Sequence, residues 1–114
     1  MNTNNLDTIS LSYDEVKDIL NQIKNVRVGV IGDGCLDIYW HADMTLSELS
    51  RETPHYPLPV VREHLYLGAG ANVAANLKSL GAKYVTILTV IGNDWRGRGV
   101  FNILKAFDIC EENI

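Results

Sequence analysis

Apolar residues recur every three or four positions between Val16 and Ile23, a period typical of an amphipathic α-helix. Ser12 suits the N-cap of this helix, and two acidic residues follow it in the first turn. We therefore predict a helix over residues 12–25 whose apolar face packs on a sheet.

Two short apolar runs rich in β-branched residues predict buried strands. The first covers residues 26–31 and the second covers residues 84–91. A glycine-containing turn follows each strand, at residues 32–34 and 92–94 respectively. Because ligands of α/β folds bind at the carboxyl ends of parallel strands, both turns are candidate site loops.

Helical spacing of apolar residues returns on either side of the second strand. One stretch covers residues 71–80 and is closed by Gly81, and another has Val100 and Phe107 on one face. The alternation of helices with strands predicts an α/β fold.

Residues 36–67 interrupt this alternation. Their first part, 36–42, is aromatic and extended in character, and the next part, 45–53, is polar. Three prolines then precede a strand-like run over residues 60–67. The pattern predicts two strands that form a flap beside the main sheet, in place of a crossover helix.

Two parallel strands are too few for three helices to cover on both faces, because an α/β sheet usually has about five or six strands. The sequence ends at residues 111–114, where a third strand is due. We therefore interpret the chain as the front part of a larger domain.

Composition narrows the classes of function. The 114 residues are 46% apolar and 21% charged, which is typical of a globular domain. A formal net charge of -4, with scattered lysines and arginines, argues against binding to nucleic acid or to an anionic membrane. Residues 1–11 are polar and carry no secretion signal, so we expect a soluble cytoplasmic protein.

Cysteine and histidine show no metal-binding pattern. Cys35 and Cys110 lie far apart and outside any CxxC motif, and we expect two reduced, partly buried thiols. His41, His55 and His64 lack the spacing of a ligand set, so we assign no metal site.

The glycine-rich segment 68–81 is the most informative candidate for a ligand loop. Gly68 and Gly70 allow close approach of the backbone to a ligand, and Asn72 can hydrogen-bond a hydroxyl group. This chemistry suits a polyol such as a sugar. Ordinary turn chemistry at the start of a helix is the alternative that this segment alone leaves open.

Two aspartates after the first strand are further candidates. Asp37 lies on the extended segment, where its carboxylate can accept hydrogen bonds from two sugar hydroxyls. Capping a turn or facing solvent is the alternative for Asp37. Asp33 is more ambiguous, since an aspartate directly after glycine often only caps a turn.

Aromatic and basic residues near these loops are less specific. Tyr39 and Trp40 can form an apolar wall for a sugar, with packing of the flap as the alternative. Asp94 suits the N-cap of the last helix. Arg96 and Arg98 can meet a phosphate or remain in solvent.

A dinucleotide-binding loop is an alternative interpretation of Gly32 and Gly34. The third glycine of the GxGxxG pattern is replaced by Asp37, and an extended segment follows. A pyrophosphate needs a helix N-terminus at that point, so the mechanism of such a loop is not met.

Three motifs stand in order along the chain. They are Val-Ile-Gly-Asp-x-x-Leu-Asp over 30–37, Gly-x-Gly-Ala-Asn-x-Ala-x(6)-Gly over 68–81 and Gly-Asn-Asp-x-x-Gly over 92–97. Together they resemble the amino-terminal part of the PfkB, or ribokinase-like, carbohydrate kinases. The resemblance covers about residues 26–108, and three ordered motifs are more specific than any one.

Within that family, residues 32–40 and 51–61 look most like the heptose 7-phosphate kinase branch, the kinase module of ADP-heptose synthesis. The second segment keeps the proline frame of the branch but departs from it at Glu52, Thr53, His55 and Tyr56. Leu67 stands where a glycine pair usually begins, and the strand before Gly92 is one residue longer than the family signature. The departures in the flap leave the identity of the sugar open.

The resemblance implies the front part of a three-layer α/β/α fold with a small β flap, or lid. Its parts would be an N-terminal helix over 12–25, a core portion over 26–35 and 68–114, and the flap over 36–67. It also implies that the flap covers the site and that flaps of two subunits pair into a homodimer. Unpaired strand edges give that pairing an independent physical reason.

By the resemblance, Asp37, Gly68, Gly70 and Asn72 bind the sugar, and Asp33 is a weaker candidate for the same pocket. The implied reaction transfers the γ-phosphoryl group of ATP to a sugar hydroxyl, assisted by Mg²⁺. The family's catalytic aspartate and nucleotide-binding segments lie later in the chain, around a Gly-x-Gly-Asp motif that these 114 residues do not contain. We therefore expect no catalytic residue here, no bound ATP or Mg²⁺, and no kinase activity from this chain alone.

Two other functions stay open at this point. One is a non-catalytic sugar-binding or dimerisation module built from the same flap and sheet. The other is a nucleotide-binding Rossmann fragment, which would respond to NAD and not to sugars.

Overall fold

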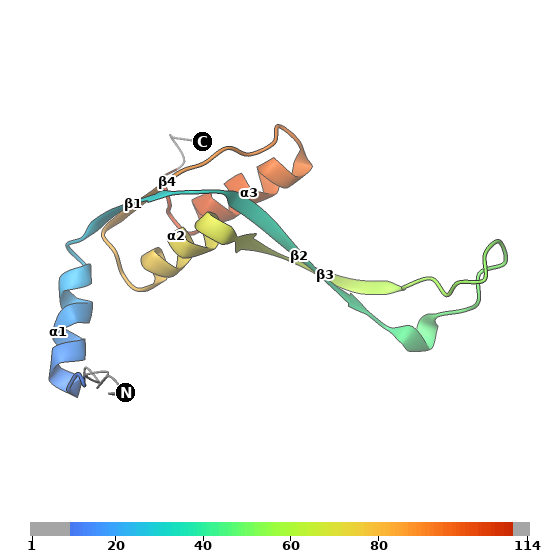
Figure 1. Ribbon diagram of the computed structural model, residues 1–114, viewed down its shortest axis with the longest axis horizontal. Helices are drawn as coiled ribbons and strands as arrows, with labels where there is room; N and C mark the ends of the chain where they lie inside the picture. The colour runs from blue at the N-terminus through green and yellow to red at the C-terminus, as the bar shows by residue number, and fades with distance from the viewer. Residues whose placement is uncertain (1–9, 111–114) are drawn as a thin grey trace, which may run out of the picture.

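The computed structural model describes residues 10–110 and shows an α/β chain (Figure 1). The elements are α1 (Tyr13–Ile23), β1 (Arg27–Ile31), β2 (Gly34–Ala42), the short 3-10 helix η1 (Met44–Leu46), β3 (Val60–Gly68), α2 (Ala69–Ser79), β4 (Tyr84–Leu88) and α3 (Trp95–Ala106). This order confirms the α/β class and the pair of strands expected in the interrupting stretch.

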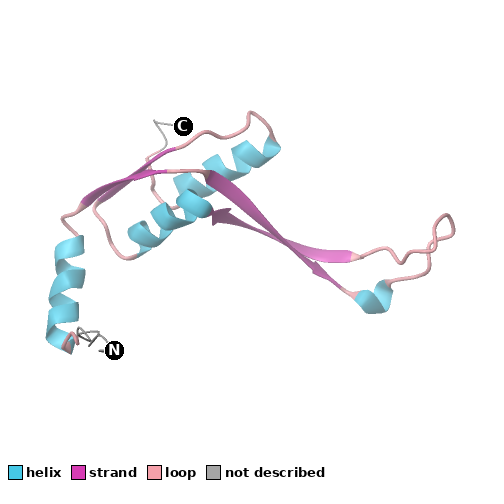
Figure 2. Ribbon diagram, in the orientation of Figure 1, coloured by secondary structure: helices cyan, strands magenta, loops and turns pink. Residues whose placement is uncertain are grey.

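β1 and β4 form a parallel two-stranded sheet, with Val28 opposite Val85 and Val30 opposite Ile87. α2 packs on both strands, and Figure 2 shows α2 and α3 gathered beside this sheet. Three alanines of α2 are buried at helical spacing, which lets the helix approach the sheet closely: Ala71, Ala74 and Ala75.

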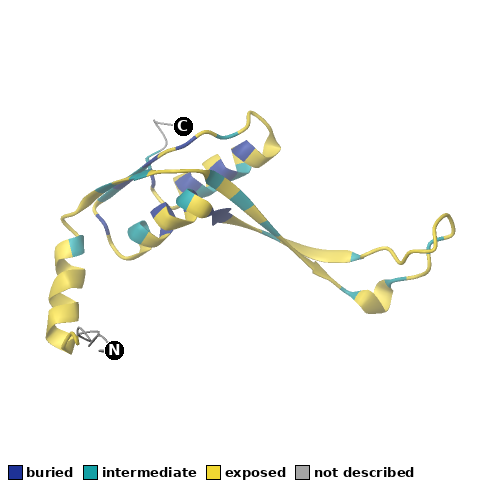
Figure 3. Cartoon of the chain, viewed as in Figure 1, coloured by how far each residue is buried: buried dark blue, intermediate teal, exposed yellow. Residues whose placement is uncertain are grey.

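The hydrophobic core lies between this sheet and the two helices. Figure 3 shows the buried residues concentrated there, while α1 and the outer part of the β2–β3 pair are exposed. The most deeply buried large side chains are Ile87, Leu104, Ile109 and Val85. The core therefore fixes the carboxyl ends of β1 and β4, where the candidate loops begin.

β2 and β3 form a separate antiparallel pair that extends away from the core as an arm (Figure 1). Cys35 lies opposite Gly68 at the inner end of this pair, and His41 lies opposite Arg62 near the outer end. Because β2 begins where a Rossmann fold would place a helix, the structure contradicts the dinucleotide-binding interpretation of Gly32 and Gly34.

The helix α1 is capped as expected but packs differently. The Ser12 hydroxyl accepts the N–H of Glu15 at 3.3 Å, and the Glu15 carboxylate accepts the N–H of Ser12 at 2.8 Å. However, no residue of α1 is buried, and Ile19 and Leu20 are 46% and 43% exposed. The expectation that α1 packs on the sheet is therefore wrong.

The face of the β1–β4 sheet opposite α2 and α3 is mixed in character. Strand alternation places Arg27 and Gly29 of β1 beside Tyr84 and Thr86 of β4 on that face. The Arg27 guanidinium lies 4.5 Å from the centre of the Tyr84 ring. Ile31 and Leu88 continue the same face and are 82% and 52% exposed, so apolar surface is left uncovered there and α1 does not cover it.

Two element boundaries also differ from the sequence prediction. β4 ends at Leu88 instead of residue 91, because its partner β1 ends at Ile31 and no ladder remains. Thr89 instead accepts the N–H of Gly34 on its hydroxyl at 2.7 Å. α2 begins at Ala69, two residues earlier than expected, with Gly68 as its N-cap.

The cysteines are free, but Cys35 is exposed and only Cys110 is half-buried, so the expected partial burial is wrong for Cys35. Residues 111–114, where a third strand is due, lie outside the described residues, and so does the polar stretch at residues 1–9. Cys110, the last described residue, forms a parallel bridge with Thr86 of β4. Among residues 10–110, no helix has the length and apolar character needed to cross a membrane.

Candidate functional site

Asp37 and Asn72 line one open hollow of about 300 Å³. Tyr39, Tyr66 and Leu67 complete its lining. Asp37 and Asn72 are exposed, so their polar groups are accessible to solvent. The structure thus brings together two side chains that are far apart in the sequence and were both singled out from it.

The register of the β2–β3 arm positions the Asp37 carboxylate. Asp37 lies opposite Tyr66, and the neighbouring pair is Cys35 opposite Gly68 on the same face of the arm. A Cβ atom built on Gly68 would lie 2.5 Å from Asp37 Oδ1. Glycine at position 68 therefore leaves the space that the Asp37 carboxylate occupies.

Gly70 connects the first loop to the start of α2. Its N–H donates to the carbonyl oxygen of Asp33 at 2.8 Å, and a Cβ atom at Gly70 would lie 2.9 Å from that oxygen. Position 70 therefore needs glycine because two backbone segments approach closely. Between the two glycines, Ala69 has a φ of 49°, a left-handed conformation that the sequence pattern did not indicate.

Asp33 contributes its backbone to this junction, but its side chain is not part of the Asp37 hollow. It lines a different hollow of about 260 Å³ with Gly32 and Thr89 among its neighbours. Of the five sequence candidates, Asp37, Asn72 and Gly68 surround one place. Gly70 and Asp33 hold the adjoining backbone.

Tyr39 and Trp40 do not form one wall, because neighbouring residues of a strand point to opposite faces. Tyr39 lines the Asp37 hollow, whereas the Trp40 indole N–H donates to Glu63 at 2.6 Å on the other face. The second aromatic wall is Tyr66, whose ring meets that of Tyr39 edge-on at 5.5 Å. The sequence reasoning missed Tyr66, and the pairing of the two flap strands is the signal that would have found it.

The third candidate loop, at residues 92–97, does not reach the Asp37 hollow. Asp94 caps α3 as expected, because its carboxylate accepts the N–H of Gly97 at 2.9 Å. This hydrogen bond lowers the pKa of Asp94, and the nearby Arg96 and Arg98 lower it further. The loop functions structurally as the N-cap of α3.

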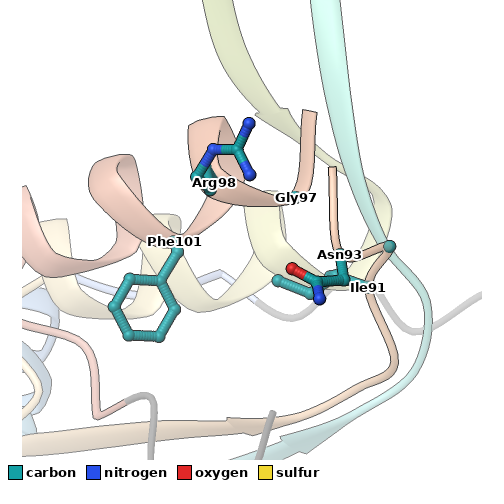
Figure 4. Close-up of a pocket in the computed structure, with 6 residues that line it drawn as sticks. Ile91, Asn93, Gly97, Arg98 and Phe101 are labelled. Carbon is teal, nitrogen blue, oxygen red and sulfur yellow. The ribbon is translucent and has the colours of Figure 1, made fainter. Parts of the chain in front are cut away.

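A separate hollow of about 280 Å³ lies beside this loop (Figure 4). Asn93, Gly97, Arg98 and Phe101 line it with Ile91 and Gly92. Figure 4 shows the Arg98 side chain directed away from Phe101. The third loop instead meets the first loop at another place, because residues 34–36 and residues 92, 94, 96 and 97 line one hollow of about 330 Å³.

Comparison with known proteins finds relatives that match most of this chain. No family model matches it. It is 38% identical over 92 residues to the bifunctional protein HldE of Pelobacter propionicus, a match covering 81% of this chain and 18% of the relative. It is 42% identical over 82 residues to the D-beta-D-heptose 7-phosphate kinase of Bordetella bronchiseptica, covering 69% and 24%. The HldE protein of Nitrosococcus oceani is 46% identical over 101 residues, covering 83% and 20%.

The chain is homologous to part of the proteins in the heptose kinase branch of the ribokinase-like family. This confirms the resemblance drawn from the three ordered motifs. The chain spans between 18% and 24% of the length of these relatives. The matched region is therefore a part of each relative that is well short of its full length.

The Asp37 hollow is rich in hydrogen-bonding groups. Within residues 10–110, no group of three or more histidine, cysteine, aspartate or glutamate side chains is placed to hold a metal ion. The Asp37 hollow instead combines one carboxylate, one amide and two phenol rings. These groups can recognise hydroxyls and the apolar face of a sugar ring.

Proposed function

We propose that this chain forms the sugar-binding part of an ATP-dependent carbohydrate kinase. Its substrate would be a sugar or sugar phosphate, with heptose 7-phosphate as the first candidate because relatives carry that name. The observation that carries the proposal is the meeting of Asp37 and Asn72 in one hollow between Tyr39 and Tyr66.

The chemistry of the hollow supports a polyol ligand. A carboxylate can accept hydrogen bonds from two neighbouring hydroxyls, and an amide can both donate and accept. The Asn72 side-chain oxygen already accepts from Asn76 at 3.4 Å one helical turn away, which leaves the Asn72 amide N–H groups for the ligand. Tyr39 and Tyr66 would pack against the carbon skeleton.

In the proposed reaction these residues position the sugar and do not carry out the chemical step. Phosphoryl transfer depends mainly on positioning and charge stabilisation, so a fixed sugar hydroxyl is a substantial contribution. ATP and Mg²⁺ are assigned to the complete enzyme.

The proposal is tested by calorimetric titration of the chain with heptose 7-phosphate. Asp37→Asn removes the negative charge and replaces one accepting oxygen by a donating NH₂ group. The substitution should weaken binding about tenfold or more. Asp14→Asn on the distant helix α1 makes the same chemical change and should leave the affinity unchanged. Equal affinities for the wild-type chain and Asp37→Asn would contradict the proposal.

We also propose that the β2–β3 arm is the lid of this site and joins two subunits in a homodimer. Trp40 is 61% exposed on the face of the arm opposite Asp37, and β-strand edges favour pairing. The same exposure supports the alternative function of a non-catalytic dimerisation module. Sedimentation should show a dimer that Trp40→Lys dissociates and that the control Trp95→Lys, on α3, leaves intact. A wild-type chain that stays monomeric at high concentration would contradict the pairing.

A further inference from the structure

The face of the arm that carries Asp37 continues outward beyond the hollow. Its cross-strand pairs are Asp37 with Tyr66, Tyr39 with His64 and His41 with Arg62. Because side chains alternate between faces along a strand, all six lie on one face. The face therefore changes in character along the arm, from one carboxylate at the inner end to three nitrogen-bearing side chains at the outer end.

We propose that His41, Arg62 and His64 form an anion subsite that receives the phosphate group of a phosphorylated sugar. The inference rests on the proposed function, because the sugar hydroxyls would lie at Asp37 and Asn72. It fixes the orientation of the substrate. The phosphate points outward along the arm, and the opposite end of the sugar points toward Gly68 and the start of α2.

Ring contacts hold the two histidines in place. The His41 and His64 rings meet edge-on at 5.1 Å, and the His64 ring stacks against that of Tyr66 at 6.0 Å. Tyr66 Oη lies 3.1 Å from His64 Nδ1. When the tyrosine hydroxyl donates to Nδ1, the proton of the His64 ring is on Nε2, and that N–H can donate to a phosphate oxygen.

The charge of Arg62 is not neutralised within the described residues. The one salt bridge among residues 10–110 joins Lys78 to Asp108, far from the arm. Glu63, the nearest carboxylate in sequence, lies on the opposite face and accepts the Trp40 indole N–H. In a chain with a net charge of -4, an exposed arginine without an acidic partner beside two histidines favours an anionic ligand.

The spacing fits one ligand that reaches both groups. Successive same-face positions on an antiparallel strand are about 7 Å apart, so His64 lies one such step from the Asp37 and Tyr66 pair. Arg62 lies a second step away, and its long side chain can reach back toward His64. A sugar ring with a phosphate on its exocyclic carbon can therefore occupy the hollow and the subsite together.

Calorimetric titration with three probes tests the subsite: heptose 7-phosphate, the unphosphorylated heptose and inorganic phosphate. Arg62→Gln and His64→Gln should each weaken binding of heptose 7-phosphate about tenfold and leave heptose binding within twofold. Two controls should bind all probes as the wild type does. Glu63→Gln changes the opposite face, and Lys17→Gln removes one positive charge from α1.

Circular dichroism of each variant verifies that the chain is folded. The subsite would be overturned if Arg62→Gln lost the same affinity for heptose as for heptose 7-phosphate, or lost affinity for neither. Heptose 7-phosphate that binds no tighter than inorganic phosphate would show a general anion patch and also overturn it. In these cases, loss of heptose binding in Asp37→Asn still supports the proposed function. A wild-type chain that binds neither sugar would overturn both.

Discussion

At the scale of single residues, the glycines have different roles that their contacts distinguish. Gly97 is buried in the first turn of α3, and a Cβ atom there would collide with the carbonyl oxygen of Gly92. Gly32 is exposed, and a Cβ atom there would meet nothing within 4 Å. Neither residue has a positive φ, so the difference between them is one of space.

Gly97→Ala should lower the free energy of unfolding by about 2 kcal/mol or more, because the new methyl group must displace backbone. Gly32→Ala is the matched control and should stay within about 0.5 kcal/mol of the wild type. Urea unfolding measures both values. Equal stabilities of the two variants would contradict this prediction and show that the backbone at 92–97 can shift to accept the methyl group without loss of stability.

The cap of α3 predicts a pH dependence. The N–H of Gly97 hydrogen-bonds the Asp94 carboxylate and lowers the pKa of Asp94 below its ordinary value of 3.8. A carboxyl whose folded-state pKa is lowered stabilises the fold above its unfolded pKa, and this contribution is lost as the pH falls through the folded pKa. Below about pH 4, Asp94→Asn should therefore lose less stability than the wild type, since the amide oxygen still caps without a charge. Thermal unfolding measured from pH 7 to pH 2 would contradict this if both chains lost stability in parallel.

At the scale of elements, local sequence signals predicted the bounds of the helices and strands, whereas tertiary contacts determined how these elements pack. The cap at Ser12 and the apolar period gave α1 nearly correct bounds, because both act within one or two turns. The packing of α1 depends on other elements, and α1 buries none of its residues although Ile31 and Leu88 leave apolar surface exposed on the sheet. No single stretch of sequence contains that information.

The candidate site shows the same division. The order of the motifs identified Asp37 and Asn72, and the structure places both in one hollow. Tyr66 and His64 were missed because their positions depend on the register between β2 and β3. Register is set by the pairing of two strands, and a one-residue shift would move every side chain to the other face.

Matched leucines test the exposed state of α1. Leu20 is 43% exposed, whereas Leu104 of α3 is fully buried. Leu104→Ala should destabilise the chain by about 2 to 5 kcal/mol, and Leu20→Ala by no more than about 0.5 kcal/mol. Chemical denaturation measures both. A loss at Leu20 comparable to that at Leu104 would mean that α1 packs against the body after all.

At the scale of the whole molecule, the chain is extended. Its radius of gyration is 21.0 Å, whereas a compact domain of 100 residues has about 13 Å. The β2–β3 arm and α1 project on opposite sides of the core in Figure 1, and this accounts for the difference. The hollow at Asp37 lies where the arm joins the core, because residues of β2, β3 and α2 line it.

Catalysis is predicted at this scale as well. The 114 residues contain no Gly-x-Gly-Asp motif, so we expect the chain alone to bind sugar without transferring a phosphoryl group. An assay that couples ADP release to NADH oxidation, with ATP, Mg²⁺ and heptose 7-phosphate present, should give no turnover above the blank. Turnover by the purified chain would contradict this expectation and require a catalytic base within it.

Amide chemical shifts recorded during titration with heptose 7-phosphate test the central proposal most directly. We expect the largest shifts at Asp37, Gly68 and Asn72, and further shifts along the arm toward His64. The hollow beside α3 serves as the internal reference, so Asn93 and Phe101 should stay unchanged. Shifts confined to residues 91–101, or no shifts at all, would contradict the assignment of the sugar site to the junction of the arm and the core.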